Sequence, residues 1–208
     1  MPIREAFSKL WPEAYAFDVL DTSLATDLAN SGSLDDAMMA RFQTLAEYAL
    51  ASEGKGGRTQ GILFTCSAFG QAIEAVKARH PVPILRPNEA AFETALGVAS
   101  RIGLVVTFEP SLSALKQELS VMAAARGKAI EIQAVLAEGA LAALKRGDGD
   151  RHDQLVADRA AKLGDVEVIV LGQFSLARAR QAVERATGRH VITTPESAAL
   201  AMKGKIDV

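Results

Sequence analysis

Residues 61–66 read Gly-Ile-Leu-Phe-Thr-Cys, a short apolar run that ends in the only cysteine of the chain. A second run, residues 166–172, reads Val-Glu-Val-Ile-Val-Leu-Gly and has the same character. Each run is short and aliphatic, and each is followed by a segment with helical spacing of its apolar residues. That combination is typical of a buried parallel strand that leads into a helix. The two runs therefore predict an α/β fold.

The rest of the chain extends this alternation of strands and helices. Five further segments have the composition of strands: 15–20, 82–85, 102–107, 129–136 and 190–193. Helical spacing predicts helices over 34–53, 67–79, 89–100, 113–126, 137–146, 150–163, 175–187 and 195–202, and another over 3–10 after Pro2. Strands that alternate with helices of this length predict parallel sheets with right-handed crossovers.

An internal repeat divides the chain in two. Residues 62–76 align with residues 169–183 and place Cys66 opposite Gln173, an offset of 173 − 66 = 107 residues. Chance similarity between two strand-to-helix turns is the alternative. A true repeat predicts two similar open parallel-sheet lobes, each a flavodoxin-like three-layer αβα unit, related by a pseudo-two-fold axis around a shared cleft. The predicted lobes are 1–96 and 97–194, and the C-terminal helix 195–203 could pack back on the first.

The same offset exposes a gap in the first lobe. The strand at 102–107 opens the second lobe, and its counterpart would fall before Met1. The first strand of the first lobe is therefore expected to be missing, either because the start was assigned too late or because the protein manages without it. Loss of a central strand would leave a long apolar edge unpaired, which is costly. A truncated start is the hypothesis that we adopt.

Composition excludes several classes of protein. The net charge is −2 and Lys and Arg are scattered, so nothing points to nucleic acid or an anionic membrane as a partner. No apolar run reaches the ~18 residues needed to span a bilayer, and the N-terminus lacks the apolar region of a signal peptide. A single cysteine forms no internal disulfide, so the chain is expected to be a reduced, cytoplasmic protein.

Cys66 is placed where a thiol has a physical reason to be reactive. It follows a strand and precedes a helix, so the backbone N–H groups of residues 67–69 could stabilise a thiolate or bind a carboxylate or oxyanion. The carboxyl edge of a parallel sheet is also where open α/β folds bind ligands. The alternative is that Cys66 fills space in the core, as free cysteines often do.

The residues around Cys66 resemble a known motif. Thr65-Cys66-Ser67 followed by Phe69-Gly70 resembles the first cysteine motif of the aspartate/glutamate/hydantoin racemase superfamily. The resemblance continues along most of the chain. It includes residues 82–85 with Asn88-Glu89-Ala90, residues 102–107 followed by Ser111 and Ser113, and Gly172-Gln173 where the family carries its second catalytic thiol.

The resemblance implies a two-lobe, cofactor-independent enzyme. In that family two thiols on opposite faces of the substrate take and return the proton on the carbon beside a carboxylate, and hydroxyls and N–H groups stabilise the enediolate. The implied substrate is a small carboxylate or amino-acid-like molecule; related racemases often pair, so a homodimer is possible. The catalytic candidates are Cys66 and Gln173. The substrate-binding candidates are Thr65, Ser67, Ala68, Asn88, Thr107, Glu109, Ser111, Phe174 and Ser175.

The chain departs from the family pattern at the second thiol. Gln173 forms hydrogen bonds but does not transfer a proton at neutral pH. Ser67 and Ala68 also stand where the family tends to have Asn and Thr, which removes one polar contact. Arylmalonate decarboxylase-like relatives have one thiol, but in the second lobe, and maleate isomerase-like relatives use the first-lobe thiol as a nucleophile but retain the second. We therefore expect isomerase or racemase-type chemistry at Cys66. The alternatives are a one-thiol decarboxylase or lyase of a small dicarboxylate, and a non-catalytic carboxylate-binding protein.

Other titratable residues are weaker candidates. Glu109 could replace the missing base if it were desolvated, but a solvated carboxylate at a turn or helix start is the better interpretation. His80, His152 and His190 are expected at the surface, and no grouping has the spacing of metal ligands. Residues 54–58 precede a strand, so they are expected to be a flexible connection and not a phosphate-binding loop.

Overall fold

The computed structural model describes residues 2–206 and contains two parallel sheets. The larger sheet has the order β6-β5-β7-β8. Its strands are β5 (Arg101–Val106), β6 (Glu131–Leu136), β7 (Val168–Leu171) and β8 (His190–Thr193). The smaller sheet pairs β3 (Ile62–Leu63) with β4 (Ile84–Leu85). The predicted α/β class and these six strands are confirmed, although β3 and β4 are shorter than predicted.

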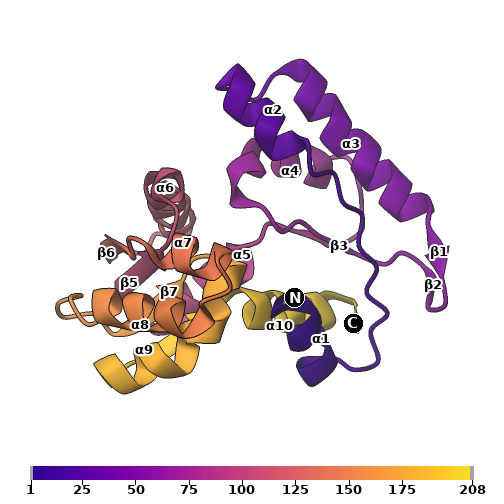
Figure 1. Cartoon of the computed structure of the whole chain (residues 1–208). Helices are drawn as coiled ribbons and strands as arrows, with labels where there is room; N and C mark the ends of the chain where they lie inside the picture. Colours follow the sequence, from indigo (N-terminus) through magenta and orange to yellow (C-terminus); the bar gives the residue numbers. More distant parts are fainter. Residues whose placement is uncertain (1, 207–208) are drawn as a thin grey trace.

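Helices connect the strands. They are α1 (Pro2–Leu10), α2 (Leu24–Ser31), α3 (Asp36–Ala51), α4 (Gly70–Lys77), α5 (Glu89–Val98), α6 (Glu109–Ala125), α7 (Ala140–Lys145), α8 (Gly149–Ala160), α9 (Arg180–Thr187) and α10 (Thr194–Ile206), with 3-10 turns η1 (Ser67–Phe69) and η2 (Phe174–Ala179). In Figure 1, α2, α3 and α4 gather around β3 on one side of the molecule. The four-stranded sheet lies on the other side with α7, α8 and α9, and α1, α5 and α10 lie between.

The central strand β5 separates the two halves of the larger core. Leu104 and Val106 face one side, where they pack in a cluster with Phe92 of α5 and Leu115 of α6. Val105 faces the other side and joins a cluster built from α7, α8, α9 and η2. Alternate residues of a strand point to opposite faces of its sheet, so a strand that is apolar throughout is covered on both. This is why the apolar runs of the sequence predict buried strands correctly.

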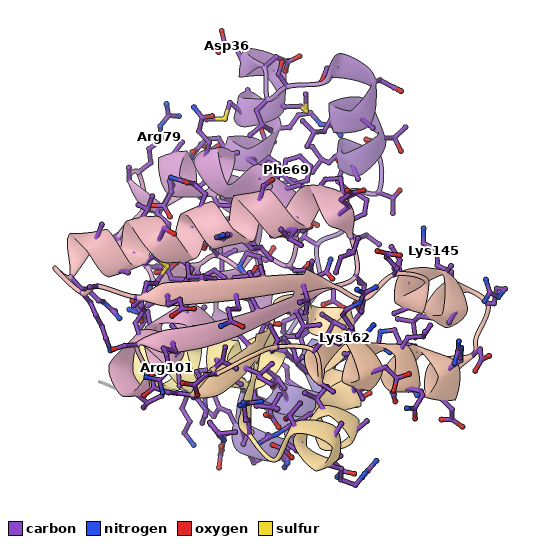
Figure 2. The ribbon with its side chains drawn as sticks, turned by 90° about the vertical axis from the view of Figure 1, so that its left-hand side faces the viewer. Asp36, Phe69, Arg79, Arg101, Lys145 and Lys162 are labelled. Carbon is purple, nitrogen blue, oxygen red and sulfur yellow. The ribbon has the colours of Figure 1, made fainter. Side chains whose placement is uncertain are left out.

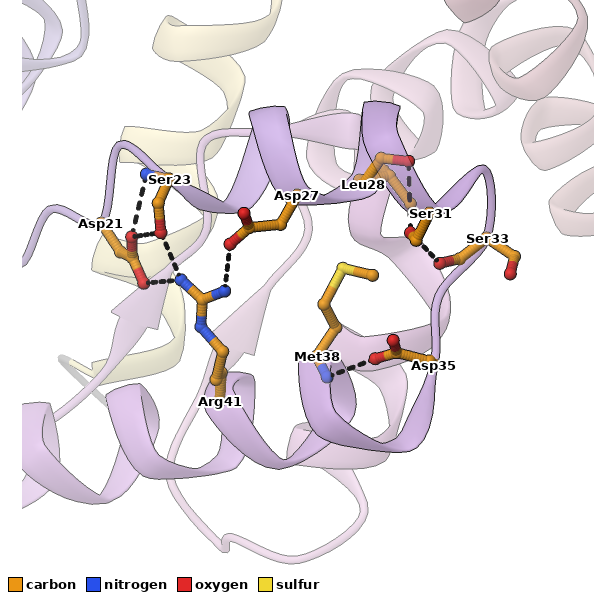
Figure 3. A network of polar contacts seen from close by, with 9 residues as sticks. All are labelled: Asp21, Ser23, Asp27, Leu28, Ser31, Ser33, Asp35, Met38 and Arg41. Carbon is orange, nitrogen blue, oxygen red and sulfur yellow. Dashed lines mark hydrogen bonds and ion pairs between the residues drawn. The ribbon is translucent and has the colours of Figure 1, made fainter.

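The smaller sheet has its own core beside α3 and α4. Phe42, Phe69 and Ile73 are buried there together, and the ring centroids of Phe42 and Phe69 are 4.8 Å apart. Helix α2, which the sequence analysis does not predict, is held on α3 by Arg41. Figure 3 shows the Arg41 guanidinium bridging Asp21 and Asp27, with Nη–O distances of 2.5 Å.

The strand pair β3–β4 of the smaller sheet and the strand pair β7–β8 of the larger sheet have equivalent registers. Ile62 of β3 pairs with Ile84 of β4, and Ile169 of β7 pairs with Val191 of β8. Each residue of the second pair follows its counterpart by 107 residues, which is the offset of the sequence repeat. However, β7 also pairs with β5 on its other edge, whereas β3 pairs only with β4 among the described residues. The strand that the repeat leads us to expect in the first half lies outside the described residues, and it stays a prediction.

Two short segments differ from the sequence prediction. Residues 15–20 form no strand. In this segment 68% of the surface of Phe17 and 81% of the surface of Leu20 are exposed. A strand needs a neighbour to complete its hydrogen-bond ladder, and none of the described residues supplies one here. Residues 53–58 are more ordered than predicted, because β1 (Glu53–Gly54) and β2 (Gly57–Arg58) form an antiparallel hairpin.

Contacts between the two halves are reciprocal. Helix α6 contacts η1, and α1 contacts η2; α6 also packs on α5, as α1 packs on α10. Figure 2 shows α6 lying across β5 and β6, on the side of the sheet that faces the part of the chain with Phe69. A pseudo-two-fold arrangement of the lobes predicts such contacts, although the axis and the boundaries 1–96 and 97–194 stay predictions. Among the helices of residues 2–206, none combines the length and hydrophobicity that crossing a membrane requires.

Candidate functional site

The candidate site lies where the strands end. Cys66 follows the end of β3 and caps η1, and its free thiol is exposed. Gln173 follows the end of β7 and caps η2, and it is half-buried. Both residues have extended backbones, with φ and ψ of −119° and 121° at Cys66 and −142° and 147° at Gln173. The two residues that the repeat aligns therefore occupy equivalent places in their halves.

Thr107 fixes one end of the Gln173 side chain. The backbone N–H and the Oγ1 hydroxyl of Thr107 both donate to Oε1 of Gln173, each over 2.7 Å. Thr107 itself is buried, with 8% of its surface exposed, directly after the central strand β5. The Gln173 carboxamide is thus held in a defined orientation.

Asn88 supports the same strand end from the other half of the molecule. Its Nδ2 donates to the carbonyl oxygen of Gly172 over 2.6 Å, and only 1% of Asn88 is exposed. Gly172 leaves little room for a side chain, because a Cβ there would lie 3.0 Å from Leu104 Cδ1 and 3.3 Å from the Val105 carbonyl oxygen. The chain in front of Gln173 is therefore packed tightly against β5.

These bonds replace the last rung of the ladder between β5 and β7. The Gly172 N–H donates to the Val105 carbonyl, so the parallel pattern would next have the Thr107 N–H donate to the Gly172 carbonyl. Instead the Thr107 N–H donates to Gln173 Oε1 and the Gly172 carbonyl accepts from Asn88. The side chains of Gln173 and Asn88 thus satisfy the two backbone groups that the open rung leaves free.

The other predicted residues follow the ends of β3, β5 and β7 along the chain. Thr65 and Ala68 are exposed, while Ser67, Phe174 and Ser175 are half-buried. Ser111 and Glu109 lie in the first turn of α6, which begins before the predicted helix start at residue 113. Glu109 is exposed, which favours the solvated interpretation over that of a desolvated base. The individual roles of these residues in substrate binding stay predictions.

Cys66 is not tied to the other candidates by a hydrogen bond within residues 2–206. The packing of η1 on α6 brings the turn behind Cys66 next to the helix that follows Thr107. Two shallow surface hollows lie elsewhere, between α8 and α9, and none of the predicted site residues lines them. The candidate site is therefore defined by the strand ends that carry its residues.

A charge cluster that includes residues on both sides of Asn88 in the sequence was not predicted. Lys77 of α4 contacts Glu89 over 2.8 Å, and Arg86 contacts Glu74 over 3.0 Å and Glu118 of α6 over 3.4 Å. Burial raises the pKa of Glu118, and Arg86 offsets this only in part. Burial alone would also raise the pKa of Glu89, but hydrogen bonds from Lys77 and the Arg86 N–H outweigh it and lower the pKa. The five residues come from three helices and from the connection before α5, so no local sequence pattern marks them.

The prediction that His152 lies at the surface is wrong. His152 is fully buried in α8, and its Nδ1 lies 2.7 Å from Asp153 Oδ1. The charged run around it suggested exposure, but the helix turns this one position toward the core. His80 is half-buried beside Gln43, and His190 is exposed. No group of three or more His, Cys, Asp or Glu residues in the described chain is arranged to hold a metal ion.

Comparison with known proteins identifies a family and a set of similar folds. The family model described as Asp/Glu/Hydantoin racemase matches residues 3–202. No curated protein matches the sequence. Among solved structures, a glutamate racemase isoform from Bacillus anthracis has a TM-score of 0.68 at 11% identity, over 98% of this chain and 76% of that one.

Two further structures have the same fold. An aspartate racemase homologue from Pyrococcus horikoshii has a TM-score of 0.67 at 12% identity, over 100% of this chain and 93% of that one. The maleate isomerase Iso from Pseudomonas putida has a TM-score of 0.60 at 18% identity, over 100% of this chain and 87% of that one. At these identities the structures establish a shared fold alone.

Proposed function

The chain belongs to the Asp/Glu/hydantoin racemase family, and from this membership we propose that it is a cofactor-independent isomerase-type enzyme. It acts on a small carboxylate or amino-acid-like substrate at the carbon beside the carboxylate. Cys66 serves as the acid/base, or as the nucleophile if the substrate carries a double bond. The observation that carries the proposal is the exposed Cys66 thiol at a strand end, in the place that the repeat pairs with Gln173.

The chemistry that this arrangement supports is a proton transfer on one face. The Cys66 thiolate takes the proton from the carbon, which leaves a thiol and an enediolate, and the thiol then returns a proton to the same carbon. Neutral donors at the strand ends would stabilise the enediolate oxygens, among them the hydroxyls of Ser67 and Ser175 and the carboxamide of Gln173. Neither of these two proton transfers needs an oxidant or an electron carrier.

The presence of Gln173 argues against racemisation as the reaction of the proposed enzyme. Inversion requires a second acid on the opposite face, and a carboxamide does not supply a proton at neutral pH. The proposed enzyme therefore exchanges the proton with retention, unless water reaches the far face. The second candidate function is decarboxylation of a small dicarboxylate, in which loss of carbon dioxide forms the enediolate and Cys66 protonates it from one side.

The test is incubation in deuterated water with aspartate, glutamate, a hydantoin and an alkylmalonate. Deuterium incorporation without inversion supports the isomerase-type proposal, and released carbon dioxide supports the decarboxylase. Cys66→Ser, which keeps size and polarity but is a far weaker acid, should abolish either signal. If the wild type shows neither signal but is stabilised against heat by the same compounds, the protein is a carboxylate-binding protein without this chemistry.

A further inference from the structure

The orientation of the Gln173 carboxamide follows from its partner. A backbone N–H donates a hydrogen bond and cannot accept one, so the atom that accepts from the Thr107 N–H is the carboxamide oxygen. The Thr107 hydroxyl donates to the same oxygen. The other end of the side chain, the Nε2 group with its two hydrogens, is therefore the end that points away from Thr107.

That amino group is free to bind a ligand. No acceptor within residues 2–206 receives a hydrogen bond from it, and it is not among the buried polar atoms of the described chain that lack a partner. Nε2 is consequently not fully buried, on a residue that is half-buried at the strand end. Since the oxygen has two bonds of 2.7 Å and Gly172 is held by Asn88, the donor is positioned before any ligand arrives.

We propose that Nε2 of Gln173, held by Thr107, binds a carboxylate oxygen of the ligand at the strand end of the second half. Gln173 is then a binding residue, and Thr107 is the positioning residue that turns its donor outward. The carboxylate is the fitting acceptor because its oxygens only accept, and a fixed N–H donor loses little freedom on binding it. This inference rests on the proposed function only for the class of ligand.

The surroundings agree with a neutral donor. The polar groups of the predicted site residues are hydroxyls, amides and a thiol, and the one charged candidate among them, Glu109, is exposed at the start of α6. A carboxylate at this edge is thus held by neutral donors. Its affinity should depend on their number and direction.

The experiment measures binding of malonate and of its uncharged analogue malonamide to the full chain by calorimetry at pH 7.5. Gln173→Glu keeps the length of the side chain and its acceptor for Thr107, but it turns an oxygen toward the ligand. Malonate affinity should fall about 10- to 150-fold, because a hydrogen bond to a charged group is lost, whereas malonamide should be affected less. Gln173→Met, which lacks both donor and charge, should also weaken malonate, and it serves if the Glu variant does not fold.

Two substitutions of Thr107 form a matched pair of variants, one without the hydroxyl and one with it. Thr107→Val removes the hydroxyl bond at nearly constant shape, so the carboxamide is held by one bond and malonate affinity should fall about 2- to 13-fold. Thr107→Ser restores the hydroxyl and should bind within twofold of the wild type. A purely structural role of Thr107 would lower the melting temperature but leave the preference for malonate over malonamide unchanged.

The outcomes separate this inference from the proposed function. Malonate binding by Gln173→Glu within twofold of the wild type would overturn the inference, as would equal losses in Thr107→Val and Thr107→Ser. No saturable binding of malonate, succinate or aspartate to the wild type would overturn it as well. Weaker malonate binding by Gln173→Glu, in a protein whose wild type shows no Cys66-dependent chemistry, would support the inference while the proposed function fails.

Discussion

The bond between Asn88 and Gly172 is the most direct test of how the two halves hold the candidate site together. Asn88 precedes α5, and Gly172 lies 84 residues later at the end of β7, so the bond joins distant parts of the chain. Both residues are buried. Replacing Asn88 with Ala removes the donor and leaves the Gly172 carbonyl without its partner.

The expected cost follows from this geometry. A buried carbonyl that loses its only partner costs about 1–3 kcal/mol. For a chain of this length, each kcal/mol lowers the melting temperature by about 2–4 °C, so Asn88→Ala should melt about 2–12 °C below the wild type. The lower end applies if the Gly172 carbonyl regains the Thr107 N–H, which would also release Gln173 and weaken its hold on a ligand.

The assay is urea denaturation followed by circular dichroism, with Asn30→Ala as the matched control. Asn30 is exposed in α2, so its replacement should change the free energy of unfolding by less than about 0.5 kcal/mol. If Asn88→Ala is also within about 0.5 kcal/mol of the wild type, the bond does not hold this strand end. The account of Gln173 positioning would then lose its support from the first half.

Three further predictions concern charge, packing and chemistry. Glu118→Gln should be more stable than the wild type at pH 7 but not at pH 4. Burial raises the pKa of Glu118 above its ordinary 4.5, so the wild type loses stability as the pH rises through this range. Denaturation at both pH values checks this, with exposed Glu13→Gln as the control variant, and a difference that does not change with pH would contradict it. Leu104→Ala should cost about 2–5 kcal/mol because Leu104 is fully buried in β5, while Leu200→Ala, at 54% exposure, should cost far less; similar losses in urea denaturation would refute the core assignment. Gln173→Cys should supply a second thiol and so add inversion of the substrate to the exchange on one face. Chiral chromatography measures the inversion. If the proposed function holds, Gln173→Ser must not cause inversion, because serine offers no comparable acid.

Much of the fold could be predicted because the signals are local. The apolar runs at 102–107 and 166–172 are buried on both faces, so their composition alone identifies strands β5 and β7. The repeat offset of 107 also predicts the common register of the two sheets. Residues 15–20 show the limit of this reasoning, since a strand-like composition gives no strand where no neighbour completes the ladder.

The candidate site was predicted in part. The sequence places Cys66 and Gln173 at strand ends, because a change from apolar run to helical spacing marks where a strand stops. It does not reveal that Asn88 and Thr107 take over an open rung of the ladder, since hydrogen bonds between residues 84 and 66 positions apart leave no local pattern. The charge cluster around Glu118 was missed for the same reason. The burial of His152 was missed because the charged residues around it suggested exposure.

The sequence by itself thus determined the class of fold, the family and the position of Gln173 opposite Cys66 in the repeat, since these depend on residue type and spacing. Only the tertiary structure decided what Gln173 does with its two ends. The direction of a carboxamide depends on which atoms surround it, and here a buried backbone N–H fixes the oxygen and leaves the amino group open. Local composition sets the elements, whereas the packing of distant elements sets the direction of the groups that meet a ligand.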